Sequence, residues 1–510
     1  MKSKNIGYLI LLLTLVWTNG MQTLAAQAGT RTNSTNNINF SLNTGWSNDS
    51  IYAFDNPKNK KLPWRAALET VGLNLTVWGF NKAMGKSHAQ VTFNSIKRNF
   101  KTGFLWDNDR FPTNMFSHPY HGNLYYNTAR SSGLNFWQSA PYTLAGSLLW
   151  EMAGECEPPS INDLMATTFG GIALGEMTFR LSSLVLDDSQ RGFKRFGREL
   201  LGLAIAPIRG FNRLITGDMW KVKHSYYKHH DYNRIPVYFS LGTGVRYLEN
   251  NQREHKGDYS GFIDLHLKYG DIYNTEENKP YDFFATRLSF SFSKTQPLIN
   301  EVNLLAKLWS TRINKEASKV TAAFGIFQHY NYHDSDEIVE GSGQIPYKLA
   351  ETVSFGPGFI YKYPGLINKV MVEEQIHASG IMLGGCTTDY YNVIDRNYNM
   401  GSGYSVKNSA TVSLDDIAKL SLNVSMYQLF TWKGYKQEDL ETKEPLYLDA
   451  QGDKGNSLFV LVNPMLEINL TNHLSANLEM SFYYRRTHYT EYPEVRTKTY
   501  ESKLGLFYTF

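Results

Sequence analysis

The chain has 510 residues, and its 51 lysines and arginines nearly balance 47 aspartates and glutamates, giving a net charge of +4. This balance excludes a strongly basic nucleic-acid binder and an acidic, solvating tail protein. Aromatic residues make up 14% of the chain, whereas hydrophobic residues reach only 42%, too few for a bundle of membrane-spanning helices. Many aromatics with low hydropathy fit a transmembrane β-barrel, where only alternate strand residues face lipid and aromatic side chains line the interfaces.

The N-terminus has the composition of a secretory signal. Two lysines precede an apolar run at residues 6–16, and small residues follow it, which is the order of charged, apolar and cleavable regions in such signals. The apolar run of about 11 residues is too short to span a bilayer. We therefore expect a signal peptide over residues 1–28, cleaved after Ala28 or Ala25, followed by an Asn- and Ser-rich linker over 29–60.

Alternating apolar and polar residues dominate residues 235–510. A period of two residues places alternate side chains on opposite faces of a strand. The alternating segments run to about ten residues or more, the length that crosses a bilayer at a tilt, whereas strands of soluble sandwiches average about five or six. Charged residues such as Asp264 and Arg287 lie on the polar face, as expected for a wet or plugged lumen. Segments begin near residues 237, 259, 282, 299, 318, 348, 369, 399, 417, 456, 473 and 496.

This count predicts a transmembrane antiparallel β-barrel of about twelve strands, because an even number closes an antiparallel barrel. The last strand places Leu504, Leu506, Tyr508 and Phe510 on one face, and Phe510 ends the chain. A terminal amphipathic strand ending in Phe resembles the signal that the barrel assembly machinery reads in outer-membrane proteins. We expect Tyr508 and Phe510 to serve as this assembly signal. The alternative is a soluble β-protein that happens to end in Phe.

Residues 61–222 carry most of the helical signal. Gly171 and Gly175 form a G-x-x-x-G step that lets two helices approach closely, and Ser160 and Asp163 form a capping box. We expect helices at residues 64–83, 121–130, 137–155, 160–186 and 191–216, the last with a kink at Pro207.

Glu176 and Arg180 lie on the helix that carries the glycine step. Charged residues argue against a lipid-facing spanning helix, since burying a charge in hydrocarbon is costly. We therefore expect the helices to form a unit that lies in the periplasm or plugs the barrel.

Several motifs of this region resemble domain-of-unknown-function family 3943, a family of predicted outer-membrane proteins of Gram-negative bacteria. The resemblance covers about residues 60–220, and it implies location and architecture but no activity, because the family has none assigned. It is carried by WRAALE at 64–69, NFKTGFLWDND at 99–109, HPYHGNLYYNTAR at 118–130, ECEPPSIND at 155–163 and RGFNRL at 209–214.

His118 and His121 form an H-x-x-H pair that could bind a metal if Glu151, Glu155 or Asp163 folded back to complete the set. Two imidazoles make a metal site only with a third ligand, and the alternative is that His118 caps or turns the chain while His121 hydrogen-bonds nearby backbone. A hydrolase would require a nucleophile such as Ser117 or Ser139 beside a histidine and an acid. The catalytic candidates are His118, His121, Glu155 and Asp163, although no local hydrolase signature supports them. We expect neither a metal site nor a cofactor.

A basic cluster occupies one or two turns of the last predicted helix. Arg191, Lys194, Arg195 and Arg198 could hold lipid phosphates at a membrane surface. The alternative, which we favour, is that the helical region's charges form structural ion pairs, since buried charges must be paired. The acids are Glu151, Glu155, Asp163, Glu176, Asp187 and Asp188, and the arginines are Arg130, Arg180, Arg191, Arg195, Arg198, Arg209 and Arg213.

Together these features predict an outer-membrane β-barrel with a structural, transport or envelope-interaction role, in which a helical unit occludes the lumen or docks at the barrel. The alternative is an outer-membrane enzyme that modifies lipid or lipopolysaccharide, working at residues 110–165. The expected partners are outer-membrane lipid and lipopolysaccharide, and the barrel assembly machinery during biogenesis. A periplasmic protein partner is left open, and nucleic acid is excluded. Cys156 and Cys386 lie in different regions, so we expect no disulfide.

Overall fold

The computed structural model describes residues 60–222, 235–249, 257–275, 278–314, 318–365, 369–390 and 396–510. The chain divides into two units, Met1–Asp49 and Ser50–Phe510, and every described residue belongs to the second. The predicted signal peptide and linker lie outside the described residues, apart from Lys60.

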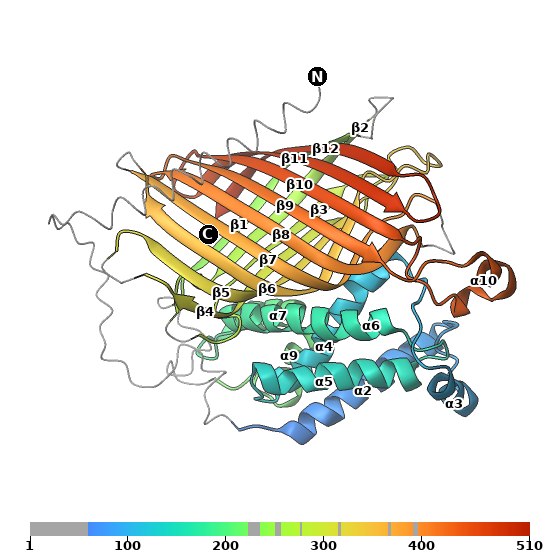
Figure 1. Ribbon diagram of the computed structural model, residues 1–510. Coiled ribbons are helices and arrows are strands. Elements are labelled where there is room, and N and C mark those ends of the chain that lie inside the picture. The colour runs from blue at the N-terminus through green and yellow to red at the C-terminus, as the bar shows by residue number, and fades with distance from the viewer. Residues whose placement is uncertain are drawn as a thin grey trace. The chain divides into compact units, whose positions relative to one another are not determined.

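Twelve antiparallel strands form a closed barrel, in which each strand pairs with its neighbours in the chain and β1 pairs with β12 (Figure 1). The predicted fold class is confirmed, and every predicted strand begins within three residues of the observed start. The strands are β1 Val237–Glu249, β2 Gly257–Tyr269, β3 Phe284–Phe292, β4 Ile299–Arg312, β5 Thr321–Asp334, β6 Lys348–Pro364, β7 Val370–Thr387, β8 Tyr398–Leu414, β9 Ala418–Thr431, β10 Gly455–Asn469, β11 Leu474–Tyr489 and β12 Val495–Thr509.

The alternation of side chains defines the two faces of the barrel wall. Arg287 of β3 bonds Glu479 of β11 at 2.7 Å, although β2, β1 and β12 separate these two strands in the wall. Their contact therefore crosses the lumen, and residues in register with them face inward. Asn303 pairs with Arg287, and Asn331 pairs with Asn303, so both asparagines also face inward. Because side chains alternate along a strand, Tyr330, which precedes Asn331, faces outward with the apolar residues on its side of the wall.

We call the described helices between Pro63 and Ile215 the helical unit. A short further helix, α10 Gln437–Thr442, lies in the β9–β10 loop. The five predicted helices are confirmed. The sequence analysis missed α3, which Thr92 and Ser95 cap reciprocally. The bounds are α2 Pro63–Ala83, α3 Phe93–Thr102, α4 His118–Ser131, α5 Phe136–Leu149, α6 Ile161–Met165, α7 Gly171–Val185, α8 Gly192–Ile205 and α9 Pro207–Ile215, with π-helical segments at Thr113–Ser117, Trp150–Gly154 and Ala166–Gly170.

The helical unit packs against the outer face of the barrel wall. The outward Tyr330 hydroxyl donates to the carbonyl of Met115 at 2.6 Å, and Gln328 donates to the carbonyl of Phe169. These contacts belong to one apolar core shared by helices and outward strand residues. Figure 1 shows α7 next to the strands, with α2 and α5 farther out. The plug interpretation was wrong, because the described helices contact the outside of the wall and not the lumen.

The unit also extends along the height of the barrel. Asn114 donates to the hydroxyl of Tyr398, at the start of β8. Arg180 donates to the carbonyl of Pro280, in the connection between β2 and β3. Strand β8 starts and strand β2 ends at opposite ends of the barrel, so the unit lies alongside the strands. Among the helices that the structure describes, none is long and apolar enough to cross a membrane by itself.

The glycine step brings α4 and α7 together, as predicted. A Cβ added at Gly171 would lie 2.5 Å from the Cα of Gly122, and one at Gly175 would lie 2.7 Å from the Tyr126 ring. The predicted capping box is only half formed. The Ser160 hydroxyl accepts the amide of Asp163, but the amide of Ser160 donates to Glu151 instead. Burial of Ser160 beside Glu151 explains this exchange of partners.

The C-terminus closes the barrel at the seam between β12 and β1. The amide of Phe510 donates to the carbonyl of Phe239 at 3.1 Å, and the two rings stack with centroids 5.1 Å apart. Tyr508 is exposed on the outer face. The role of Tyr508 and Phe510 as an assembly signal stays a prediction. Cys156 and Cys386 are both free.

Candidate functional site

A buried ion network holds the helical unit together. Glu176 accepts from Arg130 and from Arg180, both at 2.7 Å, and the Tyr126 hydroxyl donates to it at 2.9 Å. The three charged side chains are at most 2% exposed. Buried charges in this setting require partners, since an unpaired one carries its full desolvation cost. The interpretation of these charges as structural ion pairs is confirmed for this set.

The predicted anion cluster on α8 is divided by the fold. Arg195 is buried and pairs with Asp188 at 2.9 Å and Glu199 at 2.7 Å, so its place in an anion site was wrong. Lys194 is exposed, and so is Arg191. Arg198 donates to the carbonyl of Val185 and lines a surface groove with Lys194. Since Arg195 faces Asp188 and Glu199, three of the four basic residues are left near the surface. The groove's other lining residues are Gln190, Phe193, Gly197 and Leu201.

The structure brings two catalytic candidates together. Nε2 of His118 lies 3.4 Å from Oδ1 of Asp163, and Asn162 donates to both Asp163 and Asp107 at 2.9 Å. Burial, reinforced by the charge of Asp107, raises the pKa of Asp163 well above its usual value. Burial also lowers the pKa of His118. Burial therefore disfavours the charged form of both groups in this contact.

The other two candidates lie apart from this contact. His121 packs its ring against Tyr125 and Trp150, with centroids 4.7 and 5.4 Å away, and burial lowers its pKa to about 3. Burial and the charge of Glu151 raise the pKa of Glu155 well above its usual value. Among the described residues, no group of three or more metal-ligating side chains is placed to hold an ion.

The serines that the hydrolase hypothesis required do not join His118. Ser117 is exposed, and the Ser139 hydroxyl donates to the carbonyl of Asn135 at 2.8 Å. The geometry of the helical unit therefore gives the enzyme hypothesis a histidine and an acid without a nucleophile beside them.

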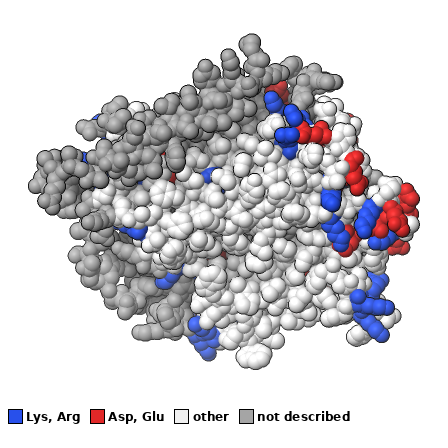
Figure 2. All heavy atoms as spheres, in the orientation of Figure 1, with Lys and Arg blue, Asp and Glu red and all other residues white. Residues whose placement is uncertain are grey.

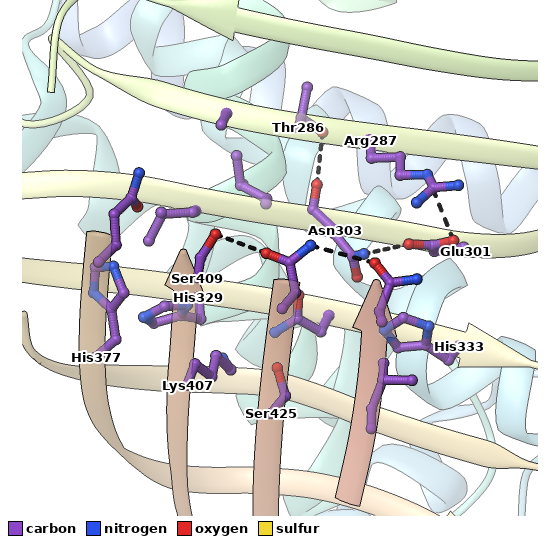
Figure 3. Close-up of a pocket in the computed structure, with 18 of the residues that line it drawn as sticks. Thr286, Arg287, Glu301, Asn303, His329, His333, His377, Lys407, Ser409 and Ser425 are labelled. Carbon is purple, nitrogen blue, oxygen red and sulfur yellow. Dashed lines mark hydrogen bonds and ion pairs between the residues drawn. The ribbon is translucent and has the colours of Figure 1, made fainter. Parts of the chain in front are cut away.

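The lumen contains a polar chamber of about 480 Å³ that the sequence analysis did not locate (Figure 3). Figure 3 shows His329, His377, Lys407 and Ser409 on one side of it, with Asn303 and other residues of neighbouring strands facing them. Twelve of its 27 lining residues are histidine, asparagine or serine: His266, Asn303, His329, Asn331, His333, His377, Asn408, Ser409, Asn423, Ser425, Asn463 and Ser481.

A charge network crosses the lumen at the edge of this chamber. Arg287 contacts Asp264 at 2.5 Å, Glu479 at 2.7 Å and Glu301 at 3.7 Å. Lys503 of β12 lies 3.5 Å from Asp264. Cations and acids from both sides of the barrel therefore satisfy one another, which ties the strands across the lumen.

Aromatic residues close the lumen beyond the chamber. Tyr347 and Tyr483 stack with centroids 4.2 Å apart, and Arg246 donates to the Tyr347 hydroxyl while pairing with Glu501 at 3.0 Å. The apolar cluster around these rings lies toward the end of the barrel that carries the long β5–β6 and β9–β10 connections. Its members are Leu248, Tyr347, Leu349, Ile381, Cys386, Tyr427, Leu429, Phe459 and Tyr483. We call these residues the luminal closure.

Several buried polar atoms of the chamber have no hydrogen-bond partner among the described residues. They include Nε2 of His329, both ring nitrogens of His377, Nε2 of His266, and the side-chain oxygens of Asn303 and Asn408. His329 and His377 are each 4% exposed, and their rings lie 5.1 Å apart. A buried polar group without a partner costs about 1–3 kcal/mol. A polar occupant of the chamber would satisfy these atoms, which makes the chamber the strongest candidate site.

The strand pattern held part of the signal for this site. Period-two alternation placed Asp264 and Arg287 on a polar face, and both lie in the lumen as predicted. The chamber histidines are His329 and His333 on β5 and His377 on β7. In these segments polar residues interrupt the apolar ones, so the alternation did not single the histidines out. Which strands face one another across the lumen is decided only by barrel closure.

Three solved structures of membrane barrels resemble part of this chain. A structure titled "NanC porin structure in rhombohedral crystal form" is 11% identical, covering 53% of this chain and 100% of its own, with a TM-score of 0.26. An anion-selective porin from Comamonas acidovorans is 7% identical, covering 54% and 99%, with a TM-score of 0.21. The COG4313 outer membrane channel from Pseudomonas putida F1 is 10% identical, covering 54% and 96%, with a TM-score of 0.27. Scores this low carry no argument about this chain.

No curated protein matches the chain. The family resemblance, by contrast, is confirmed over the helical unit. Residues 103–208 match the model of the family described as Domain of unknown function (DUF3943).

Proposed function

We propose that this protein is a gated outer-membrane barrel that binds a small polar solute in its luminal chamber and passes it when the luminal closure opens. Membrane placement is supported by the closed barrel of twelve strands, an even number as in outer-membrane barrels. The strands have 9 to 18 residues, enough to cross a bilayer. Apolar side chains such as Leu478 and Leu504 are exposed on the outer face.

The luminal chamber is the observation that carries the proposal. Its volume of about 480 Å³ lies within the range of about 300–1,000 Å³ typical of small-molecule sites. Arg287 at its edge pairs with Glu301 and Glu479, and Lys407 pairs with Glu351. The unpartnered atoms of His329, His377 and Asn408 are polar donors and acceptors. This chemistry suits an uncharged solute rich in hydroxyl or amide groups better than an ion.

The luminal closure gives the chamber a gate. Tyr347 and Tyr483 belong to the closure, and Tyr483 also lines the chamber. Tyr347 ends the β5–β6 connection, where its amide and carbonyl both bond the hydroxyl of Ser335. Movement of this connection would withdraw the Tyr347 ring and join the chamber to the other end of the barrel.

Planar-bilayer conductance of the full-length protein tests this function. We expect the native protein to show no steady conductance, because the luminal closure blocks the lumen. The double variant Tyr347→Ala/Tyr483→Ala should show stable conductance steps, since it removes both stacked rings. Tyr404→Ala is the matched control, because Tyr404 is an exposed tyrosine on β8.

Permanent conductance by the native protein would contradict the closed lumen. A folded double variant that conducts no better than Tyr404→Ala would contradict the gate. Faster migration of unheated samples in detergent gels would show that each variant has folded.

A further inference from the structure

The polarity of the helical unit is inverted relative to a water-soluble domain, in which charges are outside and apolar residues inside. Here the ion network of Arg130, Glu176 and Arg180 is buried, whereas Trp64 is 83% exposed and Phe193 is 93% exposed. The exposed apolar residues occur on several helices of the unit. They are Trp64, Leu68, Val71 and Leu75 on α2, Trp137, Leu144 and Leu148 on α5, Phe193, Phe196 and Leu200 on α8, and Phe211 and Leu214 on α9.

Exposed charges are sparse along the outermost helices. Residues 137–150, which make up almost all of α5, contain no charged residue. On α2 the charges are Arg65 and Glu69, which pair with each other near its start, and Lys82 near its end. The middle of both helices therefore presents an uncharged, apolar surface.

This surface continues from the outer face of the barrel. Figure 2 shows an uncharged surface over the strands and the helices on the side in view, with charges gathered mainly toward its edges. The helical unit lies alongside the strands and reaches from Tyr398 to Pro280, near opposite ends of the barrel. Whatever surrounds the outward strand residues at mid-height therefore also meets the helices.

We propose that the outer face of the helical unit contacts lipid acyl chains, so that the unit lies in the bilayer beside the barrel. This inference rests on the membrane placement of the barrel proposed above. Three charges of these helices lie in the interior, where Glu176 pairs with both Arg130 and Arg180. Charges paired inside a bundle avoid contact with hydrocarbon. The barrel wall holds the unit laterally, which explains how helices unsuited to crossing a membrane singly occupy this position.

The α8 groove fits the edge of such a lipid contact. Lys194 and Arg198 line it beside the exposed ring of Phe193. Arg198 bonds the carbonyl at the C-terminal end of α7, and α7 also contacts Pro280 in the β2–β3 connection. Basic residues flanking an apolar face interact with lipid phosphates at a membrane interface. The predicted anion site, without Arg195, thus becomes the headgroup edge of the proposed lipid contact.

Nitroxide labels on the full-length protein test this inference in vesicles of phosphatidylethanolamine and phosphatidylglycerol. Cys156→Ser/Cys386→Ser supplies the background, and single labels are placed at Val71 of α2 and Leu144 of α5. Val406 of β8 is the matched barrel control, because its exposed fraction of 40% is close to the 44% of Val71 and 46% of Leu144. Lys443, at the C-terminal end of α10, is the water-exposed control.

We expect the labels at Val71 and Leu144 to collide with oxygen more than with a water-soluble nickel chelate, in the ratio found at Val406. Nickel-chelate accessibility at Val71 and Leu144 equal to that at Lys443 would overturn the inference. Water-like behaviour at Val406 as well would instead overturn the membrane placement of the barrel. The outcomes therefore separate the two proposals.

Discussion

Replacing Glu176 with leucine should unfold the helical unit while leaving the barrel closed. The substitution removes the carboxylate that Arg130 and Arg180 share at 2.7 Å, and it leaves two buried guanidinium groups without that partner. Removing one member of a buried ion pair costs about 3–5 kcal/mol. We expect protease to cut the helical unit of this variant rapidly under conditions in which the native unit resists.

Arg65→Leu is the matched control for this experiment. It removes the pair of Arg65 with Glu69, whose side chains are 26% and 23% exposed, and exposed pairs contribute about 0–1 kcal/mol. Its helical unit should resist protease nearly as well as the native one. Equal resistance of Glu176→Leu and Arg65→Leu would show that the ion network does not hold the unit together. Faster migration of the unheated protein monitors the barrel separately.

Replacing Gly171 with leucine should separate α4 from α7. A Cβ at this position would lie 2.5 Å from backbone atoms of Gly122, and backbone cannot rotate away as a side chain can. Overpacking of a tight contact costs about 1–3 kcal/mol. The expected result is a lower temperature of half-maximal proteolysis for the helical unit.

Gly72→Leu on α2 provides the comparison, because nothing lies within 4 Å of a Cβ added there. Leucine also has a higher helix propensity than glycine by up to about 1 kcal/mol. This variant should therefore be as stable as the native protein or more stable. A Gly171→Leu variant that keeps the native proteolysis temperature would contradict the close packing of the two helices.

Most of the barrel was predictable because strand alternation is a local property. The start of β4 at Ile299 and that of β6 at Lys348 agree with the sequence prediction, since each follows from the residues of one segment. The location of the helical unit was not predictable in this way. Outward apolar residues such as Leu304 and Tyr330 meet helices, but the same residue types would also suit lipid. Alternation therefore identifies the outer face without telling what covers it.

The sites show the same limit. Arg287 and Glu479 meet across the lumen although 192 residues separate them, and only the closed barrel brings them together. Arg195 illustrates a different error. Lys194 and Arg198 are four residues apart and share a helix face, whereas Arg195 is turned about 100° from Lys194 and faces Asp188 and Glu199. Their closeness in sequence placed Arg195 in one cluster with Lys194 and Arg198, although the turn of the helix directs Arg195 to another face.

Fractionation of cells that express the full-length protein tests the central claim, that these strands form a closed barrel in the outer membrane. We predict that the processed protein remains in the outer-membrane fraction after washing. It should also migrate faster in detergent gels when unheated than after boiling, because the closed barrel resists detergent. Complete recovery in the soluble periplasmic fraction, with migration unaffected by heating, would contradict the account.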